Sequence, residues 1–348
     1  ILVTPTIKNG AGYMAATTYT GTGAPQSITN TVGSKSFKPD LVWIKSRSNT
    51  ANNNLFDAIR GTTNYLVSNN QLAEATNANS LTAFNSNGFT VGTDASSVGV
   101  NVNAATYVAW QWLAGAGTTS TSTSGSITST VCVNTTSGFS IVTWTGTGAN
   151  ATVGHGLGLT PSFFINMPRT GSTIYNKNAW HTSLTSNQYC IALNTTDQQY
   201  GPDATIWNST SANSSVFSVG TSTATNLFGG TYVTYCFAPI AGFSAFGSYT
   251  GNGAADGPFV YCGFRPRYVM VKPSDLTQSW TVIDTGRQPY NSNGLELYPN
   301  SSSAELTQTG STIDILSNGF KLRQSSATYN GSGSIVIYAA FAENPFNY

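Results

Sequence analysis

A hexapeptide repeated three times is the feature that most constrains this chain. It reads Tyr-Thr-Gly-Thr-Gly-Ala from residue 19, Trp-Thr-Gly-Thr-Gly-Ala from residue 144 and Tyr-Thr-Gly-Asn-Gly-Ala from residue 249. Each copy is followed by a proline and an apolar run, and each closes on a segment rich in aromatic residues. Because the markers keep the same order, the sequence predicts three tandem copies of one domain.

The copies are long enough to fold as domains. Pro39, Pro161 and Pro266 lie 122 and 105 residues apart, whereas solenoid repeats span about 20–50 residues. We therefore expect each copy to bury its own core. The expected organisation is an N-terminal segment over 1–16, repeats over 17–114, 131–240 and 241–348, and a Ser/Thr/Gly-rich linker over 115–130. Since copies two and three are joined by a short connection, we expect them to pack more rigidly on each other than on copy one.

The composition excludes several classes of partner. Charged residues make up 8% of the chain against about 25% in a typical soluble protein, and the net charge is +1. Without a basic cluster, neither nucleic acid nor an anionic membrane surface is an expected partner. No apolar run approaches the roughly 18 residues of a membrane-spanning helix. The first residue is not Met, so we expect residue 1 to be a processed end or part of a longer product.

Short apolar segments bounded by Gly, Asn or Ser predict strands throughout. The runs at 41–44, 163–165 and 268–271 are apolar at consecutive positions, which a strand tolerates only when both faces are covered. We expect these runs to be central strands. The nearest approach to a helix, at 54–60, is too short to be stable alone. The sequence therefore predicts an all-β chain of three tandem β-sandwich domains, jelly-roll or lectin-like, of about 100 residues each.

Glycines mark the expected turns. Asn87-Gly88 and Asn318-Gly319 carry the residue pair of a tight hairpin, whereas the second copy has Ser214-Ser215 there and should turn differently. The repeated Gly-x-Gly-Ala is reminiscent of a phosphate-binding loop, but such loops open a helix and none is expected here. We interpret it as a tight turn where a side chain would clash.

The sequence offers no convincing catalytic or metal site. Asp57 and Arg60 recur as Asp284 and Arg287, and a pair at this spacing most often fixes a turn. No two of the thirteen acidic residues sit together in a repeated setting, as a glycosidase carried by each copy would need. The two histidines lie in copy two without a Gly-x-Ser-x-Gly elbow. We therefore expect no enzyme activity, no catalytic residue and no cofactor.

The four cysteines also lack a metal-binding pattern. They are too widely spaced for a zinc site and lie in apolar surroundings, which favours buried free thiols over disulfides. Calcium would require clustered carboxylates, and the sequence has none.

Carbohydrate binding is compatible with the abundant Asn, Ser and aromatic residues. Trp180, Trp207 and Trp280 lie in polar surroundings between the expected core strands, and His181 follows the first of them. These four are the candidate ligand-binding residues, with partial burial against the sandwich as the alternative for the tryptophans.

Several strings resemble a repeated domain that is widespread in tailed bacteriophages, especially marine ones. They are Phe-Lys-Pro-Asp-Leu-Val-Trp-Ile-Lys over 37–45, Phe-Asn-Ser-Asn-Gly-Phe-Thr-Val-Gly over 84–92, Tyr-Val-Ala-Trp over 107–110, the segment 247–261 and Phe-Ala-Glu-Asn-Pro-Phe over 341–346. The resemblance covers about residues 17 to 346. It implies a virion protein of the tail-fibre type, with no activity and no functional residues to carry over.

The expected function is therefore that of a non-enzymatic bacteriophage virion protein, located at the virion surface after assembly in the bacterial cytoplasm. It would display repeated β-sandwich modules for host attachment, with other virion proteins and a host-surface glycan or envelope protein as partners, and it would form a homotrimer by analogy with phage fibres. A capsid decoration or head-fibre protein is the first alternative, and a surface polysaccharide depolymerase is the second.

Overall fold

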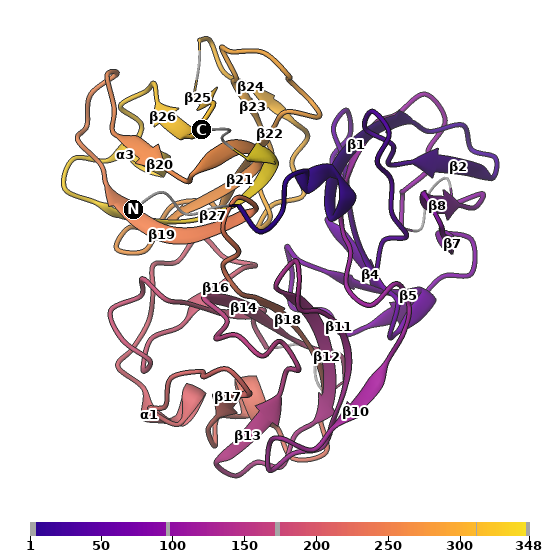
Figure 1. Ribbon diagram of the computed structural model, residues 1–348, viewed down its shortest axis with the longest axis vertical. Coiled ribbons are helices and arrows are strands. Elements are labelled where there is room, and N and C mark those ends of the chain that lie inside the picture. The colour runs from indigo at the N-terminus through magenta and orange to yellow at the C-terminus, as the bar shows by residue number, and fades with distance from the viewer. Residues whose placement is uncertain (1–4, 95–97, 171–174, 311, 346–348) are drawn as a thin grey trace.

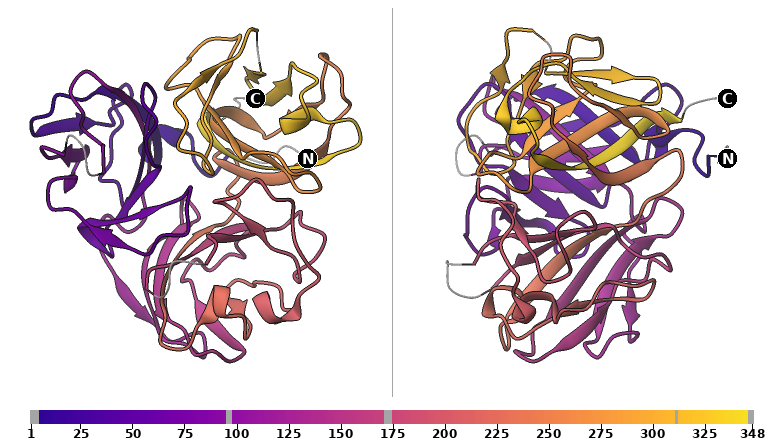
Figure 2. Two further views of the ribbon diagram at one scale, coloured as in Figure 1. Left: turned by 180° about the vertical axis from the view of Figure 1, so that it is seen from behind. Right: turned by 90° about the vertical axis from the view of Figure 1, so that its left-hand side faces the viewer.

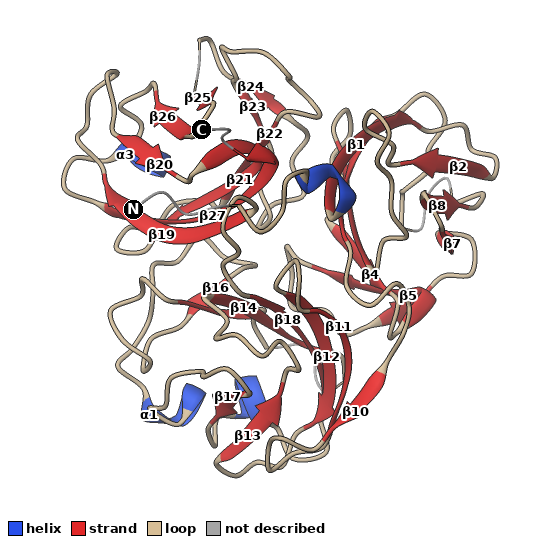
Figure 3. Ribbon diagram, in the orientation of Figure 1, coloured by secondary structure: helices blue, strands red, loops and turns tan. Residues whose placement is uncertain are grey.

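The computed structural model describes residues 5–94, 98–170, 175–310 and 312–345. The fold is all-β, as predicted. The α-helices in the described residues are single turns, α1 (Ala204–Trp207), α2 (Thr223–Asn226) and α3 (Ala327–Asn330). Figure 3 shows that, apart from these turns and the 3-10 helix η1 (Gly10–Gly12), the described chain consists of strands and loops. The segment 54–60 is a strand followed by a turn and not a helix.

The three copies are three modules built on the same four-stranded antiparallel sheet. In each, the strand ending in the repeated hexapeptide pairs with the closing aromatic strand, which pairs with the proline-preceded strand and then with the next strand. In the first module these strands are β1 (Met14–Thr20), β9 (Thr106–Trp112), β3 (Leu41–Ser46) and β4 (Asn54–Asp57). In the second they are β12 (Phe139–Thr145), β18 (Thr231–Phe237), β14 (Phe163–Pro168) and β15 (Asn178–His181). In the third they are β19 (Ser244–Thr250), β27 (Ile335–Pro345), β21 (Phe264–Pro273) and β22 (Thr281–Asp284).

A smaller sheet lies on the outer side of each module. It contains β2 (Gln26–Thr29), β8 (Gly88–Val91) and β7 (Leu81–Asn85) in the first module, β13 (Ala151–Gly154) and β17 (Val216–Val219) in the second, and β20 (Phe259–Tyr261), β26 (Gly319–Leu322) and β25 (Ile313–Leu316) in the third. The larger sheet is extended by β5 (Gly61–Val67) and β6 (Ala75–Thr76) in the first module and by β16 (Ile191–Ala192) in the second. In the third module β23 (Leu295–Glu296) and β24 (Leu306–Thr307) form a separate two-stranded sheet.

The modules are arranged around a common centre with approximate threefold symmetry. Figures 1 and 2 show the larger sheets turned toward this centre and the smaller sheets turned outward. The first and third modules, which are not consecutive in the chain, are also neighbours. The N-terminal segment supports this closure, because the amide of Thr6 donates to the carbonyl of Ala241 at 3.1 Å.

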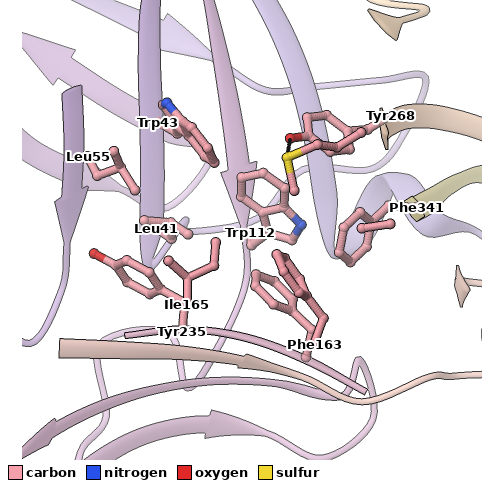
Figure 4. A pocket seen from close by; sticks show the side chains of 12 residues that line it. Leu41, Trp43, Leu55, Trp112, Phe163, Ile165, Tyr235, Tyr268 and Phe341 are labelled. Carbon is pink, nitrogen blue, oxygen red and sulfur yellow. Dashed lines mark hydrogen bonds between the residues drawn. The ribbon is translucent and has the colours of Figure 1, made fainter. Parts of the chain in front are cut away.

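The centre is an apolar core shared by all three modules, which we call the axis core. Four residues from each module line it: Leu41, Trp43, Leu55 and Trp112 from the first, Phe163, Ile165, Tyr235 and Phe237 from the second, and Tyr268, Met270, Ala339 and Phe341 from the third. Figure 4 shows these side chains converging on a small gap. The gap measures about 20 Å³ and its wall is apolar, so it has no partners for a water molecule.

This arrangement explains the consecutive apolar runs. Along β3, Leu41 and Trp43 face the axis core, whereas Val42 and Ile44 belong to a separate cluster inside the first module. The prediction that these runs form central, doubly covered strands is confirmed. The first and second modules each bury a core of their own, as expected, and a further continuous cluster that the sequence did not predict joins all three modules.

The Ser/Thr-rich segment between copies one and two is ordered. β10 (Ser120–Ser122) and the start of β11 (Ser129–Asn134) lie within it, and both strands extend the larger sheet of the second module. The first module therefore packs on both of the others instead of being set apart by a linker. The expected greater rigidity between copies two and three stays a prediction.

A repeated asparagine holds the repeated hexapeptide. In the first module, Oδ1 of Asn101 accepts from the amide of Thr22 at 2.9 Å, and its Nδ2 donates to the carbonyls of Ala24 and Gly92. Asn226 and Asn330 make the equivalent bonds in the other modules. The glycine at 21 is required because a Cβ there would lie 2.2 Å from the carbonyl oxygen of residue 102. The interpretation of Gly-x-Gly-Ala as a tight turn is therefore confirmed.

Replacing Asn101 with Ala should lower the free energy of unfolding by about 2–3 kcal/mol, because the amide makes several buried hydrogen bonds that each contribute about 1 kcal/mol. Urea denaturation followed by fluorescence measures the change. The neighbouring exposed Asn103→Ala is the control and should change stability little. An equal effect of the two substitutions would refute the capping role of Asn101.

The two predicted hairpins form, but their turns lie one residue earlier than predicted. Asn85 pairs with Gly88 and Leu316 with Gly319, so Ser-Asn occupies each turn. The glycine serves a different purpose, because a Cβ at Gly88 or Gly319 would lie 2.0 Å from a carbonyl oxygen of the neighbouring strand. In the second module β17 pairs with β13 alone, so the predicted difference there is confirmed.

Candidate functional site

Two of the four predicted ligand-binding residues lie at the boundary between the second and third modules. His181 and Trp280 are both buried. The Nε2 atom of His181 lies 3.0 Å from the carbonyl oxygen of Tyr338, and Nε1 of Trp280 donates to the carbonyl of Ala192 at 2.9 Å. Burial lowers the pKa of His181 to about 4, so its ring is neutral near pH 7. Neither residue presents a ring to solvent.

The other two predicted ligand-binding residues lie within the second module. Trp207 is buried, and its Nε1 donates to the carbonyl of Tyr189 at 3.2 Å. Trp180 is half-buried and stacks on Phe164 with ring centroids 5.5 Å apart. The structure does not bring the four residues together on one surface. Ligand stacking stays a prediction, with Trp180 as the member that keeps part of its surface exposed.

The recurrent Asp-Arg pair forms the centre of an interface between modules. Asp57 accepts from the guanidinium of Arg60 and also from its backbone amide, which fixes the turn after β4 as predicted. The hydroxyl of Tyr235, from the second module, donates to Asp57 at 2.8 Å. Glu74 then bridges Arg60 and Arg169 of the second module, with both contacts at 2.9 Å. The pair therefore fixes a turn and also joins two modules.

The same network recurs between the third and first modules. Asp284 accepts from Arg287 at 2.6 Å and from Nε1 of Trp110 at 3.0 Å, the indole coming from the first module. Glu305 bridges Arg287 and Arg47, with contacts of 2.9 and 2.8 Å. Trp110 and Tyr235 occupy equivalent positions on the closing strands of their modules. Arg47 and Arg169 are also equivalent, because each lies eight residues after the marker proline of its copy.

The charges in these networks stabilise each other in a buried setting. Burial lowers the pKa of Arg60, but Asp57 and Glu74 more than reverse this, so its pKa lies above the usual value. Burial raises the pKa of Asp284, and Arg287 with the indole of Trp110 outweighs it, so the net pKa is lowered. Both groups are therefore ionised at neutral pH. Because Asp284 is already saturated by donors, it is poorly placed to act as a base or a metal ligand.

The interface between the second and third modules has lost these charges. His181 replaces the aspartate, Leu184 replaces the arginine, and Ala339 replaces the aromatic donor of the closing strand. The backbone contact is nevertheless retained, because the amide of Gln199 donates to the carbonyl of Ser274 at 2.8 Å. The equivalent bonds run from Glu74 to Arg169 and from Glu305 to Arg47, at 2.9 and 2.8 Å. The three interfaces thus share the same backbone hydrogen bond and differ in the side chains that contact each other across them.

An exchange of large and small side chains between two paired strands explains why the third module has no aromatic hydrogen-bond donor at Ala339. Paired residues on the first and closing strands are Ala16 with Trp110 in the first module, Ile141 with Tyr235 in the second and Phe246 with Ala339 in the third. The bulky side chain has moved from the closing strand to the first strand in the third module. No indole or phenol hydroxyl is then available at this place, and His181 bonds instead to a backbone carbonyl.

A buried lysine crosses each interface. The ammonium groups of Lys45, Lys177 and Lys272 donate to backbone carbonyls of Ser302, Leu72 and Thr196 in the adjacent module, at 3.3, 2.7 and 3.1 Å. Met167 stands in the second module where the others have Lys45 and Lys272, and Lys177, the residue just before β15, supplies the missing ammonium. Burial lowers the pKa of all three lysines to about 8.

The lysines predict a specific pH dependence. An unfolded lysine has a pKa of about 10.4, so between pH 8 and that value the unfolded chain binds more protons than the folded one, and stability contributed by the lysine rises with pH. The Lys272→Met variant should therefore lose roughly 1–2 kcal/mol relative to wild type as pH rises from 7 to 9.5. Urea denaturation at each pH measures this difference.

The comparison with wild type at the same pH removes the opposing effect of the thiols. Burial raises the pKa of Cys190 to about 12, so the cysteines destabilise the fold above pH 9 in both proteins equally. Lys8→Met, at an exposed position, is the control for the change of charge. A difference between Lys272→Met and wild type that stays constant with pH would contradict the prediction.

The cysteines and His155, the other candidates for a chemical role, also have surroundings typical of structural residues. All four cysteines are free thiols, as interpreted from the sequence. Nε2 of His155 lies 3.0 Å from the carbonyl of Asn213, and Nδ1 accepts from the amide of Leu157, so both nitrogens are occupied. Among the described residues, no group of three or more His, Cys, Asp or Glu side chains could hold a metal ion. No helix in the described part of the chain is long and apolar enough to cross a membrane.

Comparison with protein families shows which family the chain resembles. A family model described as a domain of unknown function, DUF7483, matches residues 9–345. No curated protein matches the chain. This match spans all three modules of the chain.

Proposed function

Since this chain belongs to the DUF7483 family, a domain of unknown function, we propose a function from its architecture: it is a non-enzymatic structural and adhesive protein of a bacteriophage virion, used in host attachment. One observation carries the proposal. The recurrent Asp-Arg pairs that begin at Asp57 and Asp284, and that could have formed active sites, are buried between modules and hold a closed three-module unit together.

The surface chemistry supports the same proposal. The chain has 8% charged residues, so hydroxyl and amide side chains supply most of the polar surface. Such a surface suits weak, repeated contacts with glycans or other virion proteins. We further propose that each module is a β-sandwich of the jelly-roll or lectin-like kind, because a larger and a smaller sheet enclose a buried cluster such as that around Val42 and Phe89.

The threefold arrangement bears on the oligomeric state. Fibre proteins commonly place three equal domains around an axis by forming a homotrimer, and this chain places three modules around an axis by itself. We propose that one copy occupies the position of a trimer on the particle. Sedimentation of the purified chain should then give a monomer.

Imaging of intact particles with an antibody against the chain tests the proposal. We expect label on the tail, and purified protein added in excess should slow adsorption of particles to the host. Label on the capsid with no effect on adsorption would favour a decoration protein. Absence of the chain from particles would refute a virion role, and release of reducing ends from host polysaccharide would refute the non-enzymatic assignment.

A further inference from the structure

A cavity lies between the N-terminal segment and the first module. It measures about 480 Å³, which is within the size range of small-molecule sites. Figure 1 shows the N-terminal segment crossing from the third module to the first, where η1 precedes β1. The polar side chains that line the cavity are Thr6, Lys8, Asn9, Tyr13, Lys35 and Ser36. Phe37 and Leu113 add apolar walls, so the cavity combines the two kinds of surface found in ligand sites.

The second module contains a segment equivalent to one wall of this cavity. Asn134 accepts from the amide of Thr136 at 3.0 Å, as Asn9 accepts from the amide of Ala11 at 3.0 Å. Each asparagine lies five residues before the first strand of its module, so the residues before Asn9 correspond to β11, which ends at Asn134. β11 pairs with the first strand of its module, whereas the described residues before Asn9 form no strand.

The equivalent place in the second module is filled by side chains. There Val131 and Val133 of β11 pack on the loop that leads to the marker proline, 3.4 and 3.6 Å from the position of a Cβ on Gly156. Thr6 and Lys8 stand at the two equivalent positions in the first module, where the segment bonds to the third module instead. Polar side chains thus replace two valines, and a cavity replaces their contact with the loop.

The cavity also collects positive charge that the protein does not neutralise. Of the fourteen basic residues, eight form ion pairs and three are the buried lysines that bond to backbone carbonyls of an adjacent module. The other three are Lys8, Lys35 and Lys38, which make no ion pair within the part of the chain that the structure describes. Two of these three line the cavity, so an anionic group is the complementary ligand.

The neutral groups of the cavity suit a sugar ring. Asn9 uses its Oδ1 to accept from Ala11, which leaves the two hydrogens of its Nδ2 for a ligand. The ring of Tyr13 is held edge-on against Phe243, with centroids 5.8 Å apart, and its hydroxyl has no partner among the described residues. Sugars present hydroxyl groups at their edges and C–H groups on their faces, which amide donors and an aromatic or apolar wall respectively can contact.

We propose that this cavity binds an acidic saccharide, with the carboxylate of a uronic acid on Lys8 and Lys35 and its hydroxyls on Asn9 and Tyr13. The inference rests on the proposed attachment function, since a host-surface polysaccharide would supply the ligand. A membrane surface or a nucleic acid would require a wider basic surface than two lysines provide. Inorganic phosphate would leave the apolar wall of Phe37 and Leu113 without a contact.

Calorimetric titration of the full chain with tetragalacturonate tests the proposal. We expect saturable binding, about tenfold or more weaker for the neutral maltotetraose. Lys35→Gln should weaken binding of tetragalacturonate by about tenfold, because it removes a hydrogen bond between charged groups. Lys38→Gln is the matched control, since it removes the same charge three residues away. Its ammonium lies beside Gly117, outside the cavity, so binding should change by less than about twofold.

A neutral variant separates the effect of the cavity from that of its charge. Gly12 lines the cavity, and a Cβ there would meet no atom within 4 Å, so Gly12→Phe should fold like wild type. The added ring reduces the space for the ligand and should weaken binding about tenfold without changing the net charge. Circular dichroism and thermal unfolding check that each variant is folded.

Four outcomes would overturn the proposal. They are the absence of saturable binding by wild type, equal affinity for tetragalacturonate and maltotetraose, equal losses for Lys35→Gln and Lys38→Gln, and inorganic phosphate binding as tightly as tetragalacturonate at the same site. Failure of the site and failure of the proposed function are distinguishable. Tail label without saccharide binding would remove the site alone, whereas saccharide binding by a chain that is absent from particles would remove the virion role alone.

Discussion

Replacing Asp57 with Asn is expected to lower the free energy of unfolding by about 3–5 kcal/mol, the loss typical of breaking a buried ion pair by removing one partner. The substitution keeps the shape of the side chain and removes its charge. Arg60, whose side chain is fully buried, would then keep one carboxylate partner, the shared Glu74, beside the uncharged acceptors on Leu55 and Tyr235. Urea denaturation at pH 7 measures the change.

The control is Asp314→Asn, which breaks a pair between Asp314 and Arg323 at the surface. The side chain of Arg323 is 39% exposed, so water screens the pair and the expected loss is under about 1 kcal/mol. Equal losses for the two variants would show that the buried network contributes no more than a surface pair, and would contradict the role given to Asp57.

The interface between the second and third modules suggests how the loss of stability in Asp57→Asn can be avoided. The double variant Asp57→His with Arg60→Leu introduces the residues found at positions 181 and 184 of the second module. It removes both buried charges together, so it should be more stable than Asp57→Asn, because no unpaired arginine remains. A double variant less stable than the single one would mean that Asp57 and Arg60 act through other contacts.

Replacing Trp112 with Ala is expected to lower the free energy of unfolding by about 3–5 kcal/mol, as for other large aromatic residues in cores. Its ring contacts rings of both other modules, with centroids 6.1 Å from Phe237, 5.5 Å from Tyr268 and 5.6 Å from Phe341. The substitution therefore weakens the axis core at the point where three modules meet.

Trp180→Ala is the matched control for Trp112→Ala. Trp180 is half-buried and stacks on Phe164 of its own module, so the expected loss is smaller. Denaturation should be followed by both circular dichroism and tryptophan fluorescence. A loss for Trp112→Ala no larger than that for Trp180→Ala would argue against the axis core as the main link between modules.

The strands and the repeat could be predicted from the sequence because both are local signals. Apolar residues at consecutive positions in 41–44 and 268–271 correctly indicated two covered faces. What covers the second face could not be predicted, because the apolar pattern of a strand is the same whether a helix, a second sheet or another copy packs against it. The hairpin glycines show a related limit, because Gly88 is required by the approach of β2, which is distant in sequence.

The residues at the interfaces between modules could be predicted only in part from the sequence. The Asp57–Arg60 pair was recognised by its recurrence, and its turn-fixing role followed from spacing. Its partner Tyr235 lies 178 residues away and could not be paired with it from one sequence. A usable signal was nevertheless present in the asparagines that follow each hexapeptide, since Asn101 and Asn226 both lie 79 residues after the threonine whose amide they bind.

Because the three modules lie in one chain, each interface can acquire substitutions independently of the other two. In a homotrimer of identical subunits, any substitution on the axis would appear three times at once, and an exchange such as aspartate for histidine would have to be tolerated at every interface. Here His181 and Ala339 stand at one interface while Asp57 with Tyr235 and Asp284 with Trp110 persist at the other two. Placing the three modules in one chain thus gives three contacts that can be altered one at a time.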